Sequence, residues 1–162
     1  MKNLILLITV LISTNTFSQQ KPNYPEPEVR MKRVDFKLPK IINDKEYKIE
    51  IRFGQEIEVY ECDEIKDFSF NTNNLKKGYG IPPHRFPFYI LPNDITTEFV
   101  TLKSNDDKKC DKTKKIKKKV LSSQNIFDEY NSYFAIPYYI PENWTLEYRL
   151  WKIDSEYKNA EK

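Results

Sequence analysis

The chain has 162 residues, of which 31% are charged and 14% aromatic, and its formal net charge is +3. One histidine, three glycines and no Gly-x-Ser-x-Gly motif argue against a hydrolytic triad and against a glycine-rich phosphate-binding loop. We therefore predict a binding protein with no catalytic residues, no metal site and no cofactor.

The first 18 residues have the pattern of a secretory signal peptide. Lys2 precedes an apolar stretch at residues 4–12, and small polar residues follow before Gln19. The apolar stretch is shorter than the roughly 20 residues that a membrane-spanning helix needs. We predict an exported protein without a membrane span, in which residues 19–162 form a single domain; a buried N-terminal helix is the alternative.

The next segments indicate β-structure. Residues 19–30 are rich in proline and predict an extended arm. Apolar and charged residues then alternate from residue 47 to residue 59, which predicts two antiparallel strands joined near Gly54. Residues 63–81 contain three asparagines and two glycines and predict mainly loop.

The second half of the chain continues this pattern. Short apolar or aromatic strands are predicted at residues 86–91, 99–102 and 134–140, and the last alternating strand at residues 146–150. Residues 116–121 predict a lysine-rich edge strand. Since no segment has a sustained helical period, we predict an all-β fold, a compact antiparallel sandwich or barrel.

Two cysteines, Cys62 and Cys110, remain after removal of the signal peptide. In an oxidising compartment they are expected to form one disulfide, which would close a loop of about 48 residues worth roughly 4 kcal/mol. Two free buried thiols are the alternative.

A run of lysines follows Cys110, and residues 108–119 hold eight lysines against one aspartate. Such a run can bind polyanions by releasing counterions. It lacks the interleaved aromatic residues of a nucleic-acid surface, so we predict no nucleic-acid partner and interpret it as a solvated strand. A polyanion-binding module and a structural envelope protein remain alternative functions.

Several short motifs, in order, resemble the ecotin family of periplasmic serine-protease inhibitors. They are Tyr24-Pro25-x-x-Glu28-x-x-Met31-Lys32-Arg33, Ile49-Glu50-Ile51-x-Phe53-Gly54-Gln55-x-Ile57-Glu58-Val59 before Cys62, Tyr130-Asn131-Ser132, Tyr139-x-Pro141-Glu142-Asn143, and Tyr148-Arg149-Leu150-Trp151-Lys152. Their order and spacing cover nearly the whole chain after residue 19.

The resemblance implies a periplasmic inhibitor of serine endopeptidases of the trypsin fold, with a β-sandwich or barrel core. It implies a primary protease-binding loop that enters the active site like a substrate. That loop comprises Val100, Thr101, Leu102, Lys103, Ser104, Asn105, Asp106, Asp107, Lys108 and Lys109.

The resemblance also implies a secondary protease-binding surface and a homodimer made by exchange of the C-terminal strand. The secondary surface comprises Gly78, Tyr79, Gly80, Ile81, Glu129, Tyr130, Asn131, Ser132, Tyr133 and Phe134. The strand that links the protomers contains Leu146, Tyr148, Leu150 and Trp151.

This chain departs from the family pattern at these loops. The primary loop is longer than that of the family and lacks the family's methionine pair. Counting back from Cys110 places Asp107 at the reactive position, whereas alignment from the preceding strand places Leu102 or Lys103 there. We favour Leu102 or Lys103 over Asp107 and Lys108. In the secondary surface Glu129 stands where the family has an arginine, and Tyr133 where it has a lysine.

Overall fold

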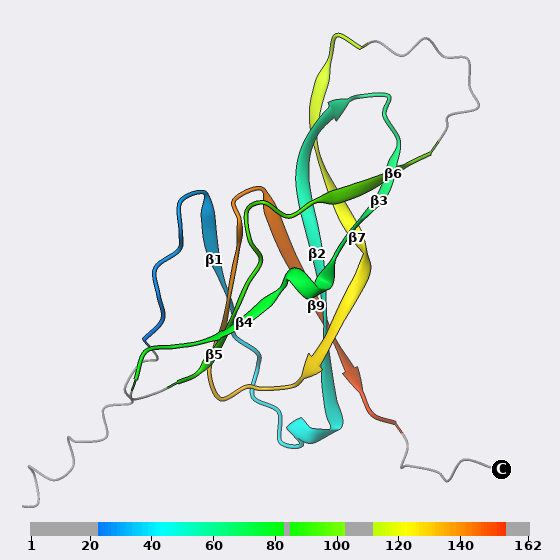
Figure 1. Ribbon diagram of the computed structural model, residues 1–162. Coiled ribbons are helices and arrows are strands. Elements are labelled where there is room, and N and C mark those ends of the chain that lie inside the picture. The colour runs from blue at the N-terminus through cyan, green and yellow to red at the C-terminus, as the bar shows by residue number, and fades with distance from the viewer. Residues whose placement is uncertain (1–22, 83–84, 103–111, 155–162) are drawn as a thin grey trace, which may run out of the picture.

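The computed structural model describes residues 23–82, 85–102 and 112–154 (Figure 1). The predicted signal peptide lies outside these residues. The described chain forms nine strands and two short 3-10 turns, and contains no α-helix.

The elements follow one another in the order β1 (Met31–Phe36), η1 (Asp44–Glu46), β2 (Tyr47–Tyr60), β3 (Ile65–Phe70), η2 (Thr72–Asn74), β4 (Lys76–Tyr79), β5 (Pro87–Ile90), β6 (Thr97–Thr101), β7 (Lys115–Glu129), β8 (Ile136–Pro141) and β9 (Trp144–Lys152). The prediction of an all-β fold is confirmed for the described residues.

The strands form two sheets that share a hydrophobic core. One has the order β1-β8-β5-β4 and the other the order β6-β3-β7-β2-β9. Both are mixed, because β5 pairs with β8 and β3 with β7 in parallel, so the prediction of a purely antiparallel arrangement is wrong. These parallel pairs join strands far apart in sequence, which local periodicity does not reveal.

The prediction of two strands joined near Gly54 is wrong, because β2 runs through this glycine without a turn. A Cβ at Gly54 would lie 2.4 Å from Thr145 Oγ1 of β9, so the glycine allows β9 to approach closely. On the other side, the pairing with β7 shifts register between Arg52 and Gly54. The extra residues of this bulge lie on β7, between Leu121 and Asn125, whereas β2 keeps an unbroken register with β9 through Gly54.

Two further expectations from the sequence are corrected. Residues 63–81 are not mainly loop, since they contain β3 and β4; a register shift between Ile65 and Asp67 interrupts the alternation that would have revealed β3. The lysine-rich strand β7 is not an edge of its sheet, because it lies between β3 and β2 in the strand order; β3 pairs with it only at Ser122, however, so residues 116–121 pair with β2 alone.

An aromatic cluster forms the centre of the core. Trp144 is 1% exposed, and its ring centroid lies 5.3 Å from those of both Phe68 and Phe70 and 6.0 Å from that of Phe53. These rings come from three strands of the five-stranded sheet, so the cluster fixes β2, β3 and β9 relative to one another.

The N-terminal arm packs on the outer face of the four-stranded sheet. Tyr24 meets Phe88 edge-to-face at 6.2 Å, Tyr139 donates a hydrogen bond to the Pro25 carbonyl, and the Arg33 guanidinium lies 4.9 Å from the Tyr24 ring centroid. The described part of the arm has no regular secondary structure, as its prolines predict. It forms a second, smaller apolar cluster.

Replacement of Trp144 by alanine is expected to destabilise the fold by about 3–5 kcal/mol, because it leaves a cavity among three phenylalanine rings. Urea denaturation measures the free energy of unfolding. Tyr133→Ala is the control: this ring is 82% exposed, and its loss should change the free energy by less than about 0.5 kcal/mol. Equal losses in the two variants would contradict this description of the core.

Candidate functional site

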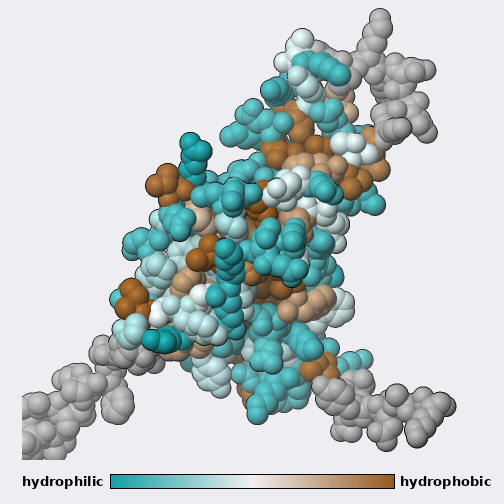
Figure 2. All heavy atoms as spheres, viewed as in Figure 1, coloured by the Kyte–Doolittle hydropathy of each residue, from teal (hydrophilic) through white to brown (hydrophobic). Residues whose placement is uncertain are grey.

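Residues 100–102 leave the five-stranded sheet at the end of β6. The Leu102 N–H donates a 2.7 Å hydrogen bond to the Glu64 carbonyl, while the Val100 and Leu102 side chains are about half exposed. Figure 2 shows hydrophobic side chains gathered over β3 and β6 at the upper right of a largely hydrophilic face. The rest of the predicted primary loop, residues 103–109, lies outside the described residues.

Cys62 lies in the turn between β2 and β3. The Asp63 N–H donates to the Tyr60 carbonyl at 2.9 Å. The Glu61 N–H donates to the Lys114 carbonyl at 3.2 Å, and the Glu61 carboxylate forms a 3.0 Å ion pair with Lys114 Nζ. The turn is thus fixed to the chain that follows Cys110. Because Cys110 lies outside the described residues, its disulfide with Cys62 stays a prediction.

Residues 78–81 end β4 and turn toward β5. A Cβ at Gly78 would lie 2.4 Å from Phe88 Cζ, so the missing side chain makes room for the ring. Gly80 is buried and its N–H bonds to the Phe86 carbonyl at 2.9 Å, whereas Tyr79 and Ile81 are at least half exposed.

Residues 129–134 connect β7 to β8. Tyr130 is only 7% exposed, and its hydroxyl donates a hydrogen bond to the Pro39 carbonyl. The Asn131 side chain accepts a 3.0 Å hydrogen bond from the Tyr133 N–H, a local turn that leaves Tyr133 exposed. Tyr130 and the buried Gly80 therefore hold their segments in place and present no surface to a partner, unlike the neighbouring Tyr79 and Tyr133.

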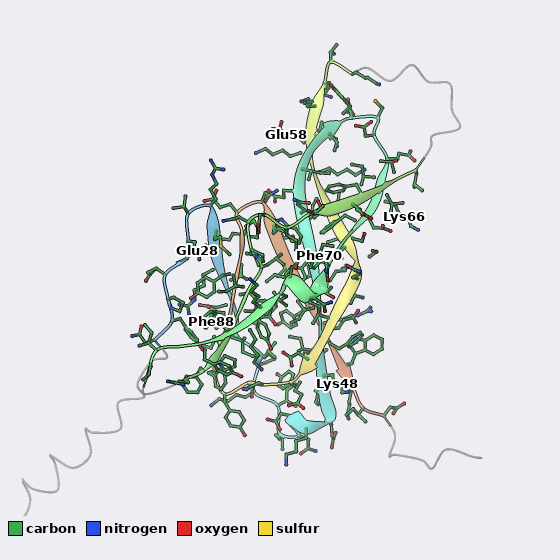
Figure 3. The ribbon with its side chains drawn as sticks, viewed as in Figure 1. Glu28, Lys48, Glu58, Lys66, Phe70 and Phe88 are labelled. Carbon is green, nitrogen blue, oxygen red and sulfur yellow. The ribbon has the colours of Figure 1, made fainter. Side chains whose placement is uncertain are left out.

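The structure links these two segments through Phe86, whose carbonyl bonds to the Gly80 N–H and whose ring meets Phe134, although the segments lie about 50 residues apart in the sequence. The Phe86 and Phe134 ring centroids are 4.4 Å apart, and Tyr24 of the N-terminal arm bonds to the Ala135 carbonyl at 3.3 Å. Figure 3 labels Phe88 at the lower left, in the aromatic cluster beside this surface. We call residues 78–81 and 129–134 together the joint surface.

The joint surface and the end of β6 lie at opposite ends of the molecule. In Figure 1, β6 ends at the upper right, whereas β4 and β5 lie at the lower left. β7 connects the two ends: it begins at Lys115, shortly after the predicted primary loop, and ends at Glu129, where the joint surface continues. Its 14 residue steps span on the order of 45 Å.

The family model described as Ecotin matches residues 20–153. The chain belongs to the ecotin family. Members of this family are periplasmic inhibitors of serine proteases and are not enzymes. The resemblance found in the sequence is thereby confirmed.

The strand that the ecotin resemblance assigns to the dimer is β9, at the edge of the five-stranded sheet. It pairs with β2 of the same chain over nine residue pairs, from Tyr47↔Lys152 to Gln55↔Trp144. Leu146 and Leu150 pack on the core, while Tyr148 and Trp151 are nearly half exposed. Among the described strands, only β2 pairs with β9, so its other edge has no strand partner there.

A buried carboxylate that the sequence analysis missed holds β9 to β2. Glu50 is 4% exposed; Arg149 donates to it through Nε and through Nη2, the latter at 3.0 Å, and Trp151 donates through Nε1. The hydrogen bonds from Arg149, helped by the one from Trp151, hold the pKa of Glu50 below its usual range against the opposing effect of burial. Glu50 occupies a charged position of an alternating strand, so the sequence pattern predicts an exposed side chain.

The lysines of β7 lie opposite glutamates of β2. Lys117 pairs in register with Glu58 and Lys119 with Glu56, and Lys119 also forms a 2.5 Å ion pair with Glu147 of β9. Opposite charges facing each other across strands stabilise a sheet and lower its local net charge. This arrangement favours the solvated strand over the polyanion-binding site.

The described residues contain no group of three or more His, Cys, Asp or Glu side chains able to hold a metal ion. His84, the only histidine in the sequence, lies outside them. Nor does any described helix have the length and apolarity needed to cross a membrane.

Acid should weaken the attachment of β9 through Glu50. Because the folded pKa is lowered, the stabilisation is complete above the ordinary glutamate pKa of about 4.3 and is lost as the pH falls through the folded value. We expect the Glu50→Gln variant to be less stable than wild type at neutral pH and to lose less stability on acidification. Urea denaturation between about pH 7 and about pH 3 measures the free energy of unfolding at neutral pH and its loss on acidification.

Glu147→Gln is the matched control. The pKa of Glu147 is also lowered, by hydrogen bonds from Lys119 and Arg52, but its side chain is 39% exposed and solvent screens these contacts. Its pH dependence should therefore lie closer to that of wild type. If Glu50→Gln lost as much stability on acidification as wild type, the buried carboxylate would not have the role described.

Proposed function

We propose that this protein inhibits serine proteases of the trypsin fold, with residues 100–109 binding in the active site as an extended, substrate-like segment. Membership of the ecotin family over residues 20–153 carries this proposal. The end of β6 supports it, because the chain leaves an ordered strand already extended and with half-exposed apolar side chains at Val100 and Leu102.

Anchoring at both ends is what would distinguish this segment from an ordinary substrate. β6 pairs with β3 up to Thr101, and on the other side the turn that carries Cys62 is bound to Lys114. The proposed Cys62–Cys110 disulfide would complete the tether. A segment ordered before binding loses little conformational entropy on entering the cleft, and its ends stay together if the peptide bond is cut.

The reactive residue is proposed to be Lys103 or Leu102. An extended inhibitor binds its protease through backbone groups as well as side chains. Because the Leu102 N–H already bonds to Glu64, we favour Lys103, the first residue beyond that bond. A lysine there would fit the acidic specificity pocket of trypsin, which would repel Asp107.

We further propose that the joint surface contacts the same protease molecule from a second protomer, and that β9 links the two protomers of a periplasmic homodimer. The length of β7, on the order of 45 Å, supports this arrangement, since the two surfaces of one chain lie at opposite ends of that strand. A second, effectively intramolecular contact can raise the affinity roughly 10²–10⁴-fold. Part of the affinity would then not depend on the active-site pocket.

Titration of trypsin, chymotrypsin and elastase with the purified protein tests this function. We expect inhibition of trypsin at or below about micromolar concentration, weakened roughly 30- to 1,000-fold in Lys103→Ala, because a buried ion pair in the specificity pocket is lost. Lys112→Ala is the matched control: this exposed lysine lies outside residues 100–109, and its loss should leave inhibition like that of wild type. No inhibition of any of the three enzymes by the wild-type protein would refute the proposal.

A further inference from the structure

A hydrogen bond between the two sheets lies directly beneath the joint surface. Tyr89 of β5 donates from its hydroxyl to Asp128 Oδ2 of β7 at 2.9 Å. Both side chains are half-buried, and the two strands belong to different sheets. Burial raises the pKa of Tyr89, and the bond to Asp128 raises it further, so this hydroxyl keeps its proton and remains a donor at any physiological pH.

Asp128 connects this bond to the 129–134 segment. Its second carboxylate oxygen, Oδ1, accepts a 2.8 Å hydrogen bond from the N–H of Glu129, the first residue of that segment. One carboxylate thus joins a side chain of the opposite sheet to the backbone at which the segment begins. Hydrogen bonds to a carboxylate are stronger than those between neutral groups, which makes this a stiff connection.

Tyr89 is fixed on its other side to the hairpin that carries residues 78–81. It pairs in register with Lys77 of β4, whose Nζ lies 5.8 Å from the Tyr89 ring centroid, and its ring stacks on Tyr138 at 4.8 Å and 18°. A continuous chain of contacts therefore runs from one half of the joint surface to the other. It passes from the β4–β5 hairpin through the Tyr89 hydroxyl and the Asp128 carboxylate to the Glu129 backbone.

We propose that Tyr89 and Asp128 are positioning residues that hold residues 78–81 and 129–134 in one fixed arrangement, so that the two segments bind a protease as a single surface. This inference rests on the proposed function. The Phe86–Phe134 contact, at 4.4 Å, also joins the two segments, but ring contacts tolerate small displacements that a hydrogen bond does not. The Tyr89–Asp128 bond thus adds a directional link between the sheets at the start of the 129–134 segment.

The test uses four variants that separate the hydrogen bond from general packing. Tyr89→Phe removes the donor, and Asp128→Ala removes the acceptor. Asp128→Asn keeps a bond, because an amide can bond to both the Glu129 N–H and the tyrosine hydroxyl. Tyr60→Phe is the matched control: it removes a hydroxyl from a half-buried tyrosine at the far end of β2.

The probe is trypsin whose active site is filled by a covalently attached peptidyl chloromethyl ketone, so that only the joint surface is able to bind. By calorimetry, Tyr89→Phe should weaken binding about fivefold, as expected for loss of one hydrogen bond, and Asp128→Ala, which also loses the bond from the Glu129 N–H, should weaken it at least as much. The double variant should bind like Asp128→Ala alone, because the bond that Tyr89 donates is already absent there. Asp128→Asn and Tyr60→Phe should stay within about twofold of wild type.

Amide chemical shifts in the free protein provide a readout that does not involve a protease. Tyr89→Phe should shift the amides of residues 79–81 and 131–134 together, whereas Tyr60→Phe should leave them in place. Unchanged shifts in Tyr89→Phe would overturn the proposed tether. So would wild-type binding to the blocked enzyme by both Tyr89→Phe and Asp128→Ala.

Failure of the proposed function would give a different result. The wild-type protein would not inhibit unblocked trypsin, while Tyr89→Phe would still change the amide chemical shifts of both segments. If wild type inhibited unblocked trypsin but did not bind the blocked enzyme, the joint surface would not act as a binding surface and this inference would fall alone.

Discussion

The architecture depends on the close approach of β9 to β2 at Gly54. The strand β2 pairs with β7 on one side and β9 on the other, and it continues through Gly54 because no Cβ stands against Thr145. Any larger residue would push β9 away and disturb Trp144, one position before Thr145 at the centre of the core. One missing side chain thus allows a single strand to extend through the whole molecule.

The length of β2 and β7 bears on the proposed function. Their ladder runs from Tyr60↔Lys115 to Lys48↔Glu129. The Cys62 turn and the end of β6, where the predicted primary loop begins, lie at the first end, and the joint surface lies at the other. In the proposed function this ladder would keep the two surfaces apart, so that one chain would present two separate binding regions and a dimer four.

The sequence predicted the class of fold and the family, because alternating strands and the order of short motifs are local features. It failed where distant pairing decides the structure: Gly54 suggested a turn, and the asparagines of residues 63–81 concealed β3 and β4. At the candidate site it singled out the two segments of the joint surface, whose binding role stays a prediction. It did not separate the buried Tyr130 from the exposed Tyr133, and it missed Glu50, Tyr89 and Asp128, whose side-chain partners lie 39 or more residues away. No pattern within one strand reveals such contacts.

The proposed inhibition requires that the chain between β6 and Cys110 be held rigidly enough to occupy a protease cleft without being consumed. The most direct measurement is mass spectrometry of the intact protein during incubation with catalytic amounts of trypsin. We predict cleavage at a single bond within residues 100–109, with cut and uncut forms reaching a stable ratio while inhibition persists. Cuts at several lysines of this region, followed by steady degradation, would contradict the account.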